Sequence, residues 1–240
     1  MTFYDFEGNS ITVQEFIALY EPCYFIGNSK AKGFVHTQSS SYVENQEIMP
    51  ILQGHISSYS DLAKVMAWKI GKIKHLESEK TKVMQYASDW AHCESENPLR
   101  YGRVMELQKL ADYILKHQPE LEDDAINNPQ ECLCRLRDVG TKGIGTVYLI
   151  TLLFFLSHGM YPIYDRFAMA SLMAAEEDMS PHLEKTIKVP NLPSKGAKGF
   201  SAICKNQYAD YIKRLEDLNV DYQNDRGLDR ALWVYGHGFI

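Results

Sequence analysis

The stretch from Asp138 to Ala175, DVGTKGIGTVYLITLLFFLSHGMYPIYDRFAMASLMAA, decides which fold this sequence encodes. It starts with a tight glycine turn at Gly143 and Gly145, and a second turn passes through Gly159 and Pro162. The apolar residues between the turns cover every side of a helical wheel, so we expect a helix surrounded by protein. About a dozen residues are too few for a membrane span, which needs about 20. The apolar residues are Val147, Leu149, Ile150, Leu152, Leu153, Phe154, Phe155 and Leu156.

A second helix is expected directly before the glycine turn, over residues 129–139. Pro129 suits the first turn of a helix, and Gly140 stands where the helix would end. The local unit is therefore a helix, a glycine hairpin and a second helix. Two glycines in front of a helix allow a sharp turn and leave backbone N–H groups pointing outward, where they can hold a phosphate.

This unit resembles the helix-hairpin-helix DNA glycosylase superfamily, which includes endonuclease III and the 8-oxoguanine glycosylases. The signature of that superfamily is a Leu-Pro-Gly-Val-Gly hairpin, a buried helix and a Pro-Val-Asp element with a catalytic aspartate. Here the hairpin positions are Thr141 to Gly145, and the aspartate is Asp165 in Pro-Ile-Tyr-Asp. Asp165 lies 20 residues after Gly145, as is usual in the family. The resemblance implies a predominantly all-α fold with a short irregular or β N-terminal region.

Several positions depart from the family pattern. Thr141 and Lys142 replace Leu-Pro, and Arg166 follows the aspartate in place of a small or β-branched residue. Bifunctional members carry a lysine where this chain has Thr146 and Val147, so the resemblance implies a monofunctional enzyme without lyase activity. A second register, with 138–142 as the hairpin, would make Lys142 the nucleophile, but it lacks a second glycine and lengthens the distance to the aspartate.

The resemblance also implies roles for individual residues of this sequence in DNA repair by base excision. Asp165 would be the catalytic carboxylate, stabilising an oxocarbenium-like sugar and helping to deprotonate water. An aspartate at a helix start is equally a favoured N-cap, and the two roles are compatible. The DNA phosphate would be bound by Lys142, Gly143, Ile144, Gly145 and Thr146. Further pocket or DNA contacts would come from His158, Tyr161, Tyr164, Arg166, Lys69 and Lys72.

Composition describes an ordinary globular protein of 240 residues, with 45% hydrophobic and 23% charged residues. The net charge of −6 argues against a protein that coats nucleic acid by charge alone. The most basic segment, 64–82, carries six lysines against two glutamates, and it is either a patch for the DNA backbone or a solvated surface. Trp68 within this segment is expected in the core.

The five cysteines lack the framing of a disulfide scaffold and suit reduced thiols in the cytoplasm. Of these, only Cys204 follows Asp165, so the four-cysteine iron–sulfur cluster of some relatives is not expected. Cys132 and Cys134 are interpreted as part of a buried helix stripe. The sequence predicts no metal site and no cofactor, although a monovalent cation at the hairpin would be compatible with the resemblance.

The remaining sequence suggests residues 1–60 as a region of mixed structure and 61–240 as the helical glycosylase-like domain. Further helices are expected over 12–20, 61–70, 100–117, 165–175, 205–218 and 225–235, with Thr12, Ser60 and Asp225 as caps. Pro119 and the acidic residues 120–124 are expected to end the third of these, and 176–201 to form a loop.

The expected partner is double-stranded DNA, with no membrane, and the expected oligomeric state is a monomer. Two alternatives remain at this point. One is a helix-hairpin-helix protein that binds DNA without catalysis. The other is a fold relative with a protein-interaction or defence role, in which Asp165 serves only as a helix cap.

Overall fold

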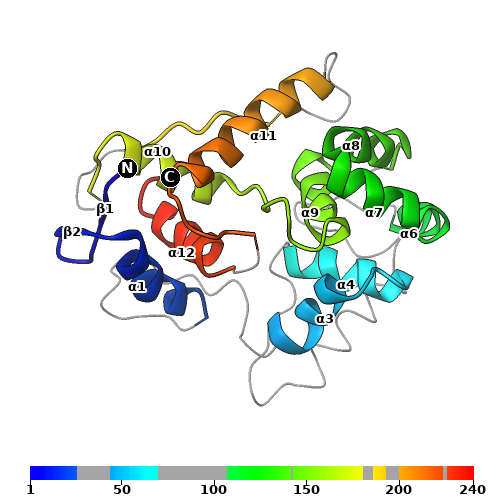
Figure 1. Cartoon of the computed structure of the whole chain (residues 1–240), viewed down its shortest axis with the longest axis horizontal. Coiled ribbons are helices and arrows are strands. Elements are labelled where there is room, and N and C mark those ends of the chain that lie inside the picture. The colour runs from blue at the N-terminus through cyan, green and yellow to red at the C-terminus, as the bar shows by residue number, and fades with distance from the viewer. Residues whose placement is uncertain (26–43, 70–106, 142, 181–185, 193–199, 224–225) are drawn as a thin grey trace. The chain divides into compact units, whose positions relative to one another are not determined.

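A computed structural model of the chain describes residues 1–25, 44–69, 107–141, 143–180, 186–192, 200–223 and 226–240 (Figure 1). Within them the chain forms ten α-helices, one π-helical turn and one two-stranded antiparallel hairpin. The expected predominantly helical fold with a small β element at the N-terminus is therefore confirmed for these residues. Among the helices so described, none combines the length and apolar character needed to cross a bilayer.

The chain folds into two compact units. Unit 1 comprises Met1–Gln38, Pro162–Leu192 and Ala202–Ile240, and unit 2 comprises Ser39–Tyr161 and Pro193–Ser201. Unit 1 is therefore built from both ends of the chain, whereas unit 2 is its middle. The boundary expected near residue 60 falls inside unit 2.

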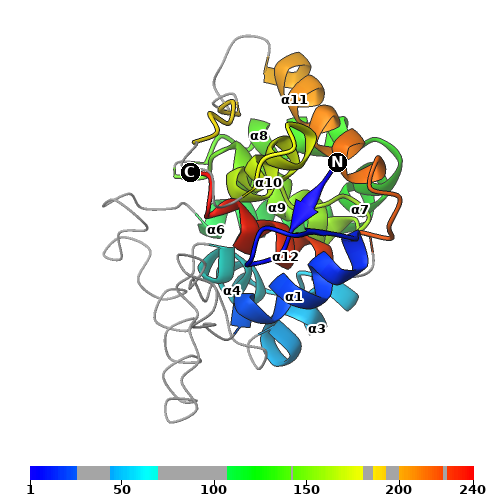
Figure 2. The same cartoon turned by 90° about the vertical axis from the view of Figure 1, so that its left-hand side faces the viewer.

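Unit 1 begins with strands β1 (Phe3–Tyr4) and β2 (Ser10–Ile11), in which Phe3 pairs with Ile11 and Tyr4 with Ser10. Its helix α12 packs against both α1 and α10 (Figure 1, Figure 2). The helices of this unit are α1 (Val13–Phe25), α10 (Arg166–Glu176), α11 (Phe200–Glu216) and α12 (Gly227–Gly236).

The core of unit 1 is an aromatic cluster at which the hairpin, α1 and α12 meet. The rings of Phe3 and Phe16 stack with centroids 4.1 Å apart, and both contact the ring of Tyr235 edge to face. Tyr20 joins the same cluster and donates its hydroxyl hydrogen to the carbonyl of Tyr4 at 2.9 Å. These large buried rings hold the first residues of the chain against its last helix.

The start of α1 follows the sequence prediction. The backbone N–H and the hydroxyl of Thr12 both donate to a carboxylate oxygen of Glu15 at 2.8 Å, and the N–H of Glu15 donates to the Thr12 hydroxyl at 3.2 Å. This reciprocal pair is a capping box. The predicted cap at Thr12 is therefore confirmed, and the helix continues past the expected end to Phe25.

Unit 2 surrounds α9 (Thr146–Leu156), which contacts α3, α4, α7 and α8. Every residue from Leu149 to Leu156 is buried, which confirms the expected all-round burial of this helix, although Val147 is half-buried. The other elements are the π-helical turn Glu44–Ile48 and the helices α3 (Met49–Gln53), α4 (Tyr59–Lys69), α6 (Leu107–Lys116), α7 (Gln118–Asn127) and α8 (Pro129–Asp138).

One helix lies where the sequence suggested a helix end. Helix α7 runs through the acidic segment after Lys116, with Pro119 in its first turn and Glu120 close behind. A proline is well placed in a first turn because its missing N–H would have no partner there, and a nearby carboxylate complements the helix dipole. Pro119 therefore starts a helix instead of only ending the one before.

Three predicted helix starts also differ. The hydroxyl of Ser58, and not that of Ser60, accepts the N–H of Asp61 at the start of α4. Arg226 precedes α12, while the expected cap Asp225 lies outside the described residues. Helix α11 begins at Phe200 instead of Lys205. The helix over 100–117 is seen from Leu107 onward, its first part lying outside the residues described.

Candidate functional site

The glycine hairpin lies in unit 2 between α8 and α9. Gly140 and Gly143 have φ of +71° and +76°, in the left-handed region that favours glycine. Ile144 is buried, whereas Gly143 is exposed. Thr141 is 1% exposed and its hydroxyl has no hydrogen-bond partner among the described atoms. Lys142, expected to add charge here, lies outside the described residues.

Gly145 differs from the two left-handed glycines. It is the N-cap of α9 with φ −94° and ψ 178°, a conformation open to any residue. Among the described residues, a Cβ atom built there would have the Tyr148 ring as its nearest neighbour, at 4.0 Å. As glycine it provides no side-chain cap to the helix. Neither its backbone angles nor its packing against the described residues therefore requires glycine at 145.

Asp165 is the N-cap of α10 in unit 1. One carboxylate oxygen, Oδ1, accepts the N–H of Phe167 at 2.9 Å, as the sequence predicted for a helix cap. The residue is half-buried. Because the cap bond restrains the side chain, the carboxylate has a defined orientation at the start of the helix.

Tyrosines of α11 hold the segment that leads to Asp165. Tyr208 donates its hydroxyl hydrogen to the carbonyl of Pro162, and Tyr211 donates to the carbonyl of Ile163 at 3.2 Å. Both tyrosines are buried. Their contribution to the placement of Asp165 could not be seen in the sequence, because it depends on which helix packs against 162–165.

Tyr164 is part of the same packing. Its ring contacts that of Tyr211 with centroids 5.2 Å apart, and its hydroxyl donates to the carbonyl of Pro190 at 3.5 Å. Burial, with a smaller contribution from the negative charge of Asp165, raises the pKa of Tyr164 to about 12. The side chain is thus a packed core residue, and a contact with DNA would require it to leave the core.

Arg166 is exposed beside the candidate carboxylate. Its guanidinium carbon lies 4.8 Å from the centroid of the Phe167 ring, a cation–π contact. The described residues show no carboxylate paired with it.

Tyr161 belongs to unit 2. It is half-buried and donates its hydroxyl hydrogen to the carbonyl of Ile126 at 3.5 Å.

The basic segment is described only as far as Lys69. Lys64 forms an ion pair with Glu47 at 2.8 Å, and Lys69 is half-buried at the end of α4. Trp68 is buried and donates its indole N–H to Glu44 at 2.7 Å, which confirms its expected place in the core. Lys72 and the later lysines lie outside the described residues. Of the described lysines of this segment, Lys64 is therefore paired within unit 2.

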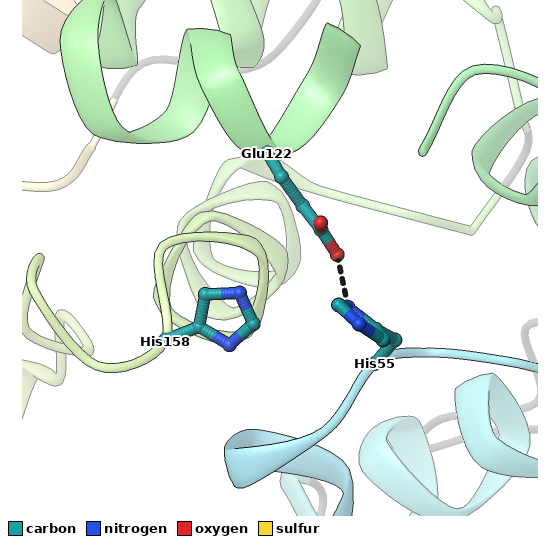
Figure 3. Close-up of side chains that lie close together, drawn as sticks. All are labelled: His55, Glu122 and His158. Atoms are coloured by element: carbon teal, nitrogen blue, oxygen red, sulfur yellow. Dashed lines mark hydrogen bonds and ion pairs between the residues drawn. The ribbon is translucent and has the colours of Figure 1, made fainter. Parts of the chain in front are cut away.

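His158 is brought together with two residues that the sequence did not single out, His55 and Glu122 (Figure 3). His55 and Glu122 are 67 residues apart in the chain, and no local spacing links them. Glu122 lies on α7, in the acidic stretch that was interpreted as a helix end. Recognising the start of α7 from Pro119 and Glu120 would have placed Glu122 on a helix. It would not have identified His55 and His158 as its neighbours.

Cys132 fits its expected place in a buried helix stripe, whereas Cys134 is only partly buried. Cys132 is fully buried in α8, and burial raises the pKa of its thiol to about 12. Cys134 on the same helix is half-buried. The buried thiol of Cys132 is therefore a packing residue of α8.

Comparison with known proteins gives no relative. No family model, no curated protein and no solved structure matches this chain. Two groups of residues therefore carry the functional argument. One is the hairpin with Asp165, and the other is the cluster around His158.

Proposed function

We propose that this chain is a DNA base-excision glycosylase of the helix-hairpin-helix type, monofunctional, which cleaves the N-glycosidic bond of a damaged base. The hairpin at 141–146 binds a backbone phosphate of double-stranded DNA, and Asp165 acts on the sugar. The observation that carries this proposal is Gly145, a glycine that neither its backbone angles nor its described neighbours require.

Gly145 supports phosphate binding because it has no side chain at the start of α9. A Ser, Asn or Asp side chain at an N-cap stabilises a helix better than glycine does. The position has the space and the backbone angles for such a residue. A phosphate oxygen that approaches the first turn of α9 needs that space, and the helix dipole attracts its charge. Glycine at 145, itself a common N-cap residue, thus leaves the space that a backbone-binding phosphate would occupy.

Asp165 supports the chemical step. Cleavage of the N-glycosidic bond develops positive charge on the sugar, and a fixed carboxylate stabilises it and orients water for attack. The cap bond to Phe167 and the tyrosine bonds to 162–163 fix this carboxylate before substrate arrives. Thr146 and Val147 stand where a Schiff-base lysine would be, which favours hydrolysis without strand cleavage.

The second candidate function is DNA binding without catalysis. It is favoured by the cap role of Asp165, which by itself accounts for an aspartate at the start of α10. In that case the hairpin still contacts phosphate, but no base is released.

The substitution Asp165→Asn separates these two functions. Asparagine is as good an N-cap as aspartate, so the variant keeps the start of α10 but loses the negative charge. Wild type and variant are incubated with duplexes that carry 8-oxoguanine, uracil, alkylated purines or mismatches. We expect base release by the wild type on one of these and a loss of about a hundredfold or more in the variant, with DNA affinity retained.

Two outcomes would count against the enzyme. Release of the base by the variant at the wild-type rate would remove Asp165 from the mechanism. Binding of all duplexes by the wild type, with no base released from any, would contradict base excision for those lesions and favour the non-catalytic function.

A further inference from the structure

We propose that His55, Glu122 and His158 form a binding site for one zinc ion in unit 2. Their ligand atoms all lie within 4.8 Å of one another, with no ion present. The proposal concerns unit 2 alone and does not depend on DNA binding or on Asp165.

Three separate segments supply the three side chains. His55 stands in the loop between α3 and α4, Glu122 on α7, and His158 directly after the end of α9. In Figure 3 the Glu122 side chain extends from its helix to His55, and the ring of His158 lies beside them. The imidazole rings of the two histidines have centroids 5.6 Å apart. An ion at this point would join three parts of the unit that are distant in the sequence.

The ring of His158 is oriented for metal binding. Its Nδ1 lies 3.2 Å from the carbonyl oxygen of Leu52. A carbonyl only accepts hydrogen bonds, so Nδ1 carries the proton and the Nε2 of a neutral ring keeps its lone pair. Metal-binding histidines commonly donate their other ring N–H to a carbonyl or carboxylate in this way, which fixes both tautomer and ring orientation.

The backbone of His158 gives a second, independent observation. Its N–H donates to the carbonyl of Phe155 at 3.1 Å, and the N–H of Gly159 donates to that of Phe154 at 2.8 Å. These two bonds define a Schellman motif, whose left-handed residue is usually glycine. Here that residue is His158, with φ +51°. Asp178 and Asn219 adopt the same conformation, so the cost is small, but a histidine here in place of glycine supports a role for the imidazole.

Glu122 is likewise held by a neighbour. Its Oε1 accepts the side-chain N–H of Gln118, one turn earlier on α7, at 2.9 Å, and lies 2.7 Å from Nδ1 of His55. The carboxylate is 18% exposed and the His55 ring 57% exposed. Glu122 is therefore fixed by the fold, while His55 and His158 are exposed to solvent, so an ion can enter the site from outside.

The distances suit zinc after small side-chain rotations. Zinc–ligand bonds of about 2.0–2.2 Å at tetrahedral angles place ligand atoms roughly 3.4 Å apart. The His55–Glu122 pair must open slightly from 2.7 Å, and the widest separation must close from within 4.8 Å. Two imidazoles and one carboxylate form the ligand set of several catalytic zinc sites, in which water takes the fourth position. Magnesium and calcium, which prefer all-oxygen sites, fit this set poorly.

The alternative is a plain ion pair between His55 and Glu122, with His158 serving only the helix end. The substitution His158→Gly distinguishes the two. Glycine suits the left-handed position, so the metal-free variant should fold with a melting temperature equal to or above that of the wild type. A zinc site would lose one of its three protein ligands, whereas an ion pair between His55 and Glu122 would remain intact.

The test is zinc titration of chelator-treated full-length protein by calorimetry, with magnesium as a comparison ion. We expect one zinc per chain in the wild type and at least a hundredfold weaker binding in His158→Gly and in Glu122→Gln. Gln118→Leu, which removes only the bond that holds the carboxylate, should weaken binding about tenfold. His117→Gln replaces a histidine of the same unit outside the cluster and should bind zinc as the wild type does.

Two results would overturn the proposal. One is a wild-type protein that takes up no zinc at micromolar concentrations. The other is unchanged zinc binding in both His158→Gly and Glu122→Gln, which would place the ion elsewhere. Because the measurement is zinc uptake and not base release, the outcome is independent of the proposed glycosylase activity.

Discussion

Gly143 and Gly145 belong to the same Gly-Ile-Gly turn in the sequence, but their backbone conformations differ. Gly143 has φ +76°, where any side chain is strained. Gly145 has an extended backbone and room for a methyl group. The sequence predicted the turn from two glycines, but only the backbone angles separate the glycine that makes the turn from the one that leaves its surface bare.

Alanine should therefore act mainly on stability at position 143 and mainly on DNA binding at position 145. We expect Gly143→Ala to lower the free energy of unfolding by about 1–2 kcal/mol through backbone strain. Gly145→Ala should lower it by about 0.5–1 kcal/mol, because alanine is a poorer N-cap than glycine, and weaken DNA binding about tenfold, because the methyl group meets the phosphate. Denaturant unfolding and fluorescence anisotropy with a duplex would measure these effects. Unchanged DNA affinity in a stable Gly145→Ala would argue against phosphate binding at the hairpin.

The capping box of Thr12 and Glu15 predicts a pH effect. Hydrogen bonds from the N–H and hydroxyl of Thr12 lower the pKa of Glu15 below its ordinary value. The folded state therefore favours the carboxylate, so this contribution to stability is full above the unfolded pKa and is lost as pH falls through the folded pKa. Wild type and Glu15→Gln should differ in melting temperature at pH 7 and converge toward pH 3.

Glu120→Gln is a suitable control for this experiment. Glu120 is also a first-turn residue, but it makes no side-chain hydrogen bond or ion pair with any described residue. Its substitution should change the melting temperature less at pH 7. A constant difference between wild type and Glu15→Gln from pH 7 to pH 3 would contradict the assignment of the effect to the carboxylate.

At the scale of elements, α10 and α12 meet at a contact that only glycine allows. A Cβ atom on Gly236 would lie 1.8 Å from the backbone carbonyl oxygen of Phe167. The obstacle is backbone and not a side chain that could rotate, so one helix would have to move. This contact also lies directly after Asp165, at the start of α10.

We therefore expect Gly236→Ala to lower the free energy of unfolding by about 3 kcal/mol, at the upper end of the cost of overpacking. Thermal unfolding followed by circular dichroism would measure it, and Gly145→Ala is the matched control, since its methyl group has room. Base release should fall as well, because the displaced helix carries Asp165 at its start. A variant as stable as the wild type would contradict the close approach of α10 and α12.

The helices around the hairpin were predictable because each carries several agreeing signals. Helix α8 has Pro129 in its first turn, α9 is apolar on all sides, and α10 has an aspartate cap. Helix α7 was missed because Pro119 and a run of acidic residues usually mark a break. The same residues favour a helix start when they fall in a first turn. Missing α7 also meant missing Glu122.

At the scale of the molecule, the division into units could not be read from composition. Unit 1 joins both ends of the chain: α1 packs on α12, and the N–H of Ile187 donates to the carbonyl of Phe239 at 2.8 Å. Such pairings are set by side-chain fit between distant segments, and they leave no change of composition at residue 38 or 161. The cluster of His55, Glu122 and His158 arises in the same way within unit 2.

From the net charge of −6 we predict how the DNA affinity of the whole chain depends on salt. Binding through many lysines and arginines releases many counterions, and a protein with six to ten such contacts shows a steep fall of affinity with salt. Backbone N–H groups at a hairpin add affinity without displacing as many ions. We therefore expect the plot of log affinity against log salt to have a slope of about −2 to −3, measured between about 50 and 200 mM salt.

The substitution Lys142→Ala should make this slope shallower by about 1, because one cation at the hairpin is lost. Replacing Lys72 by alanine tests the basic segment 64–82 in the same way. A wild-type slope of about −6 or steeper, reduced by Lys72→Ala but not by Lys142→Ala, would place DNA on the basic segment. The hairpin would then be an interhelical turn, and Gly145 would need another explanation.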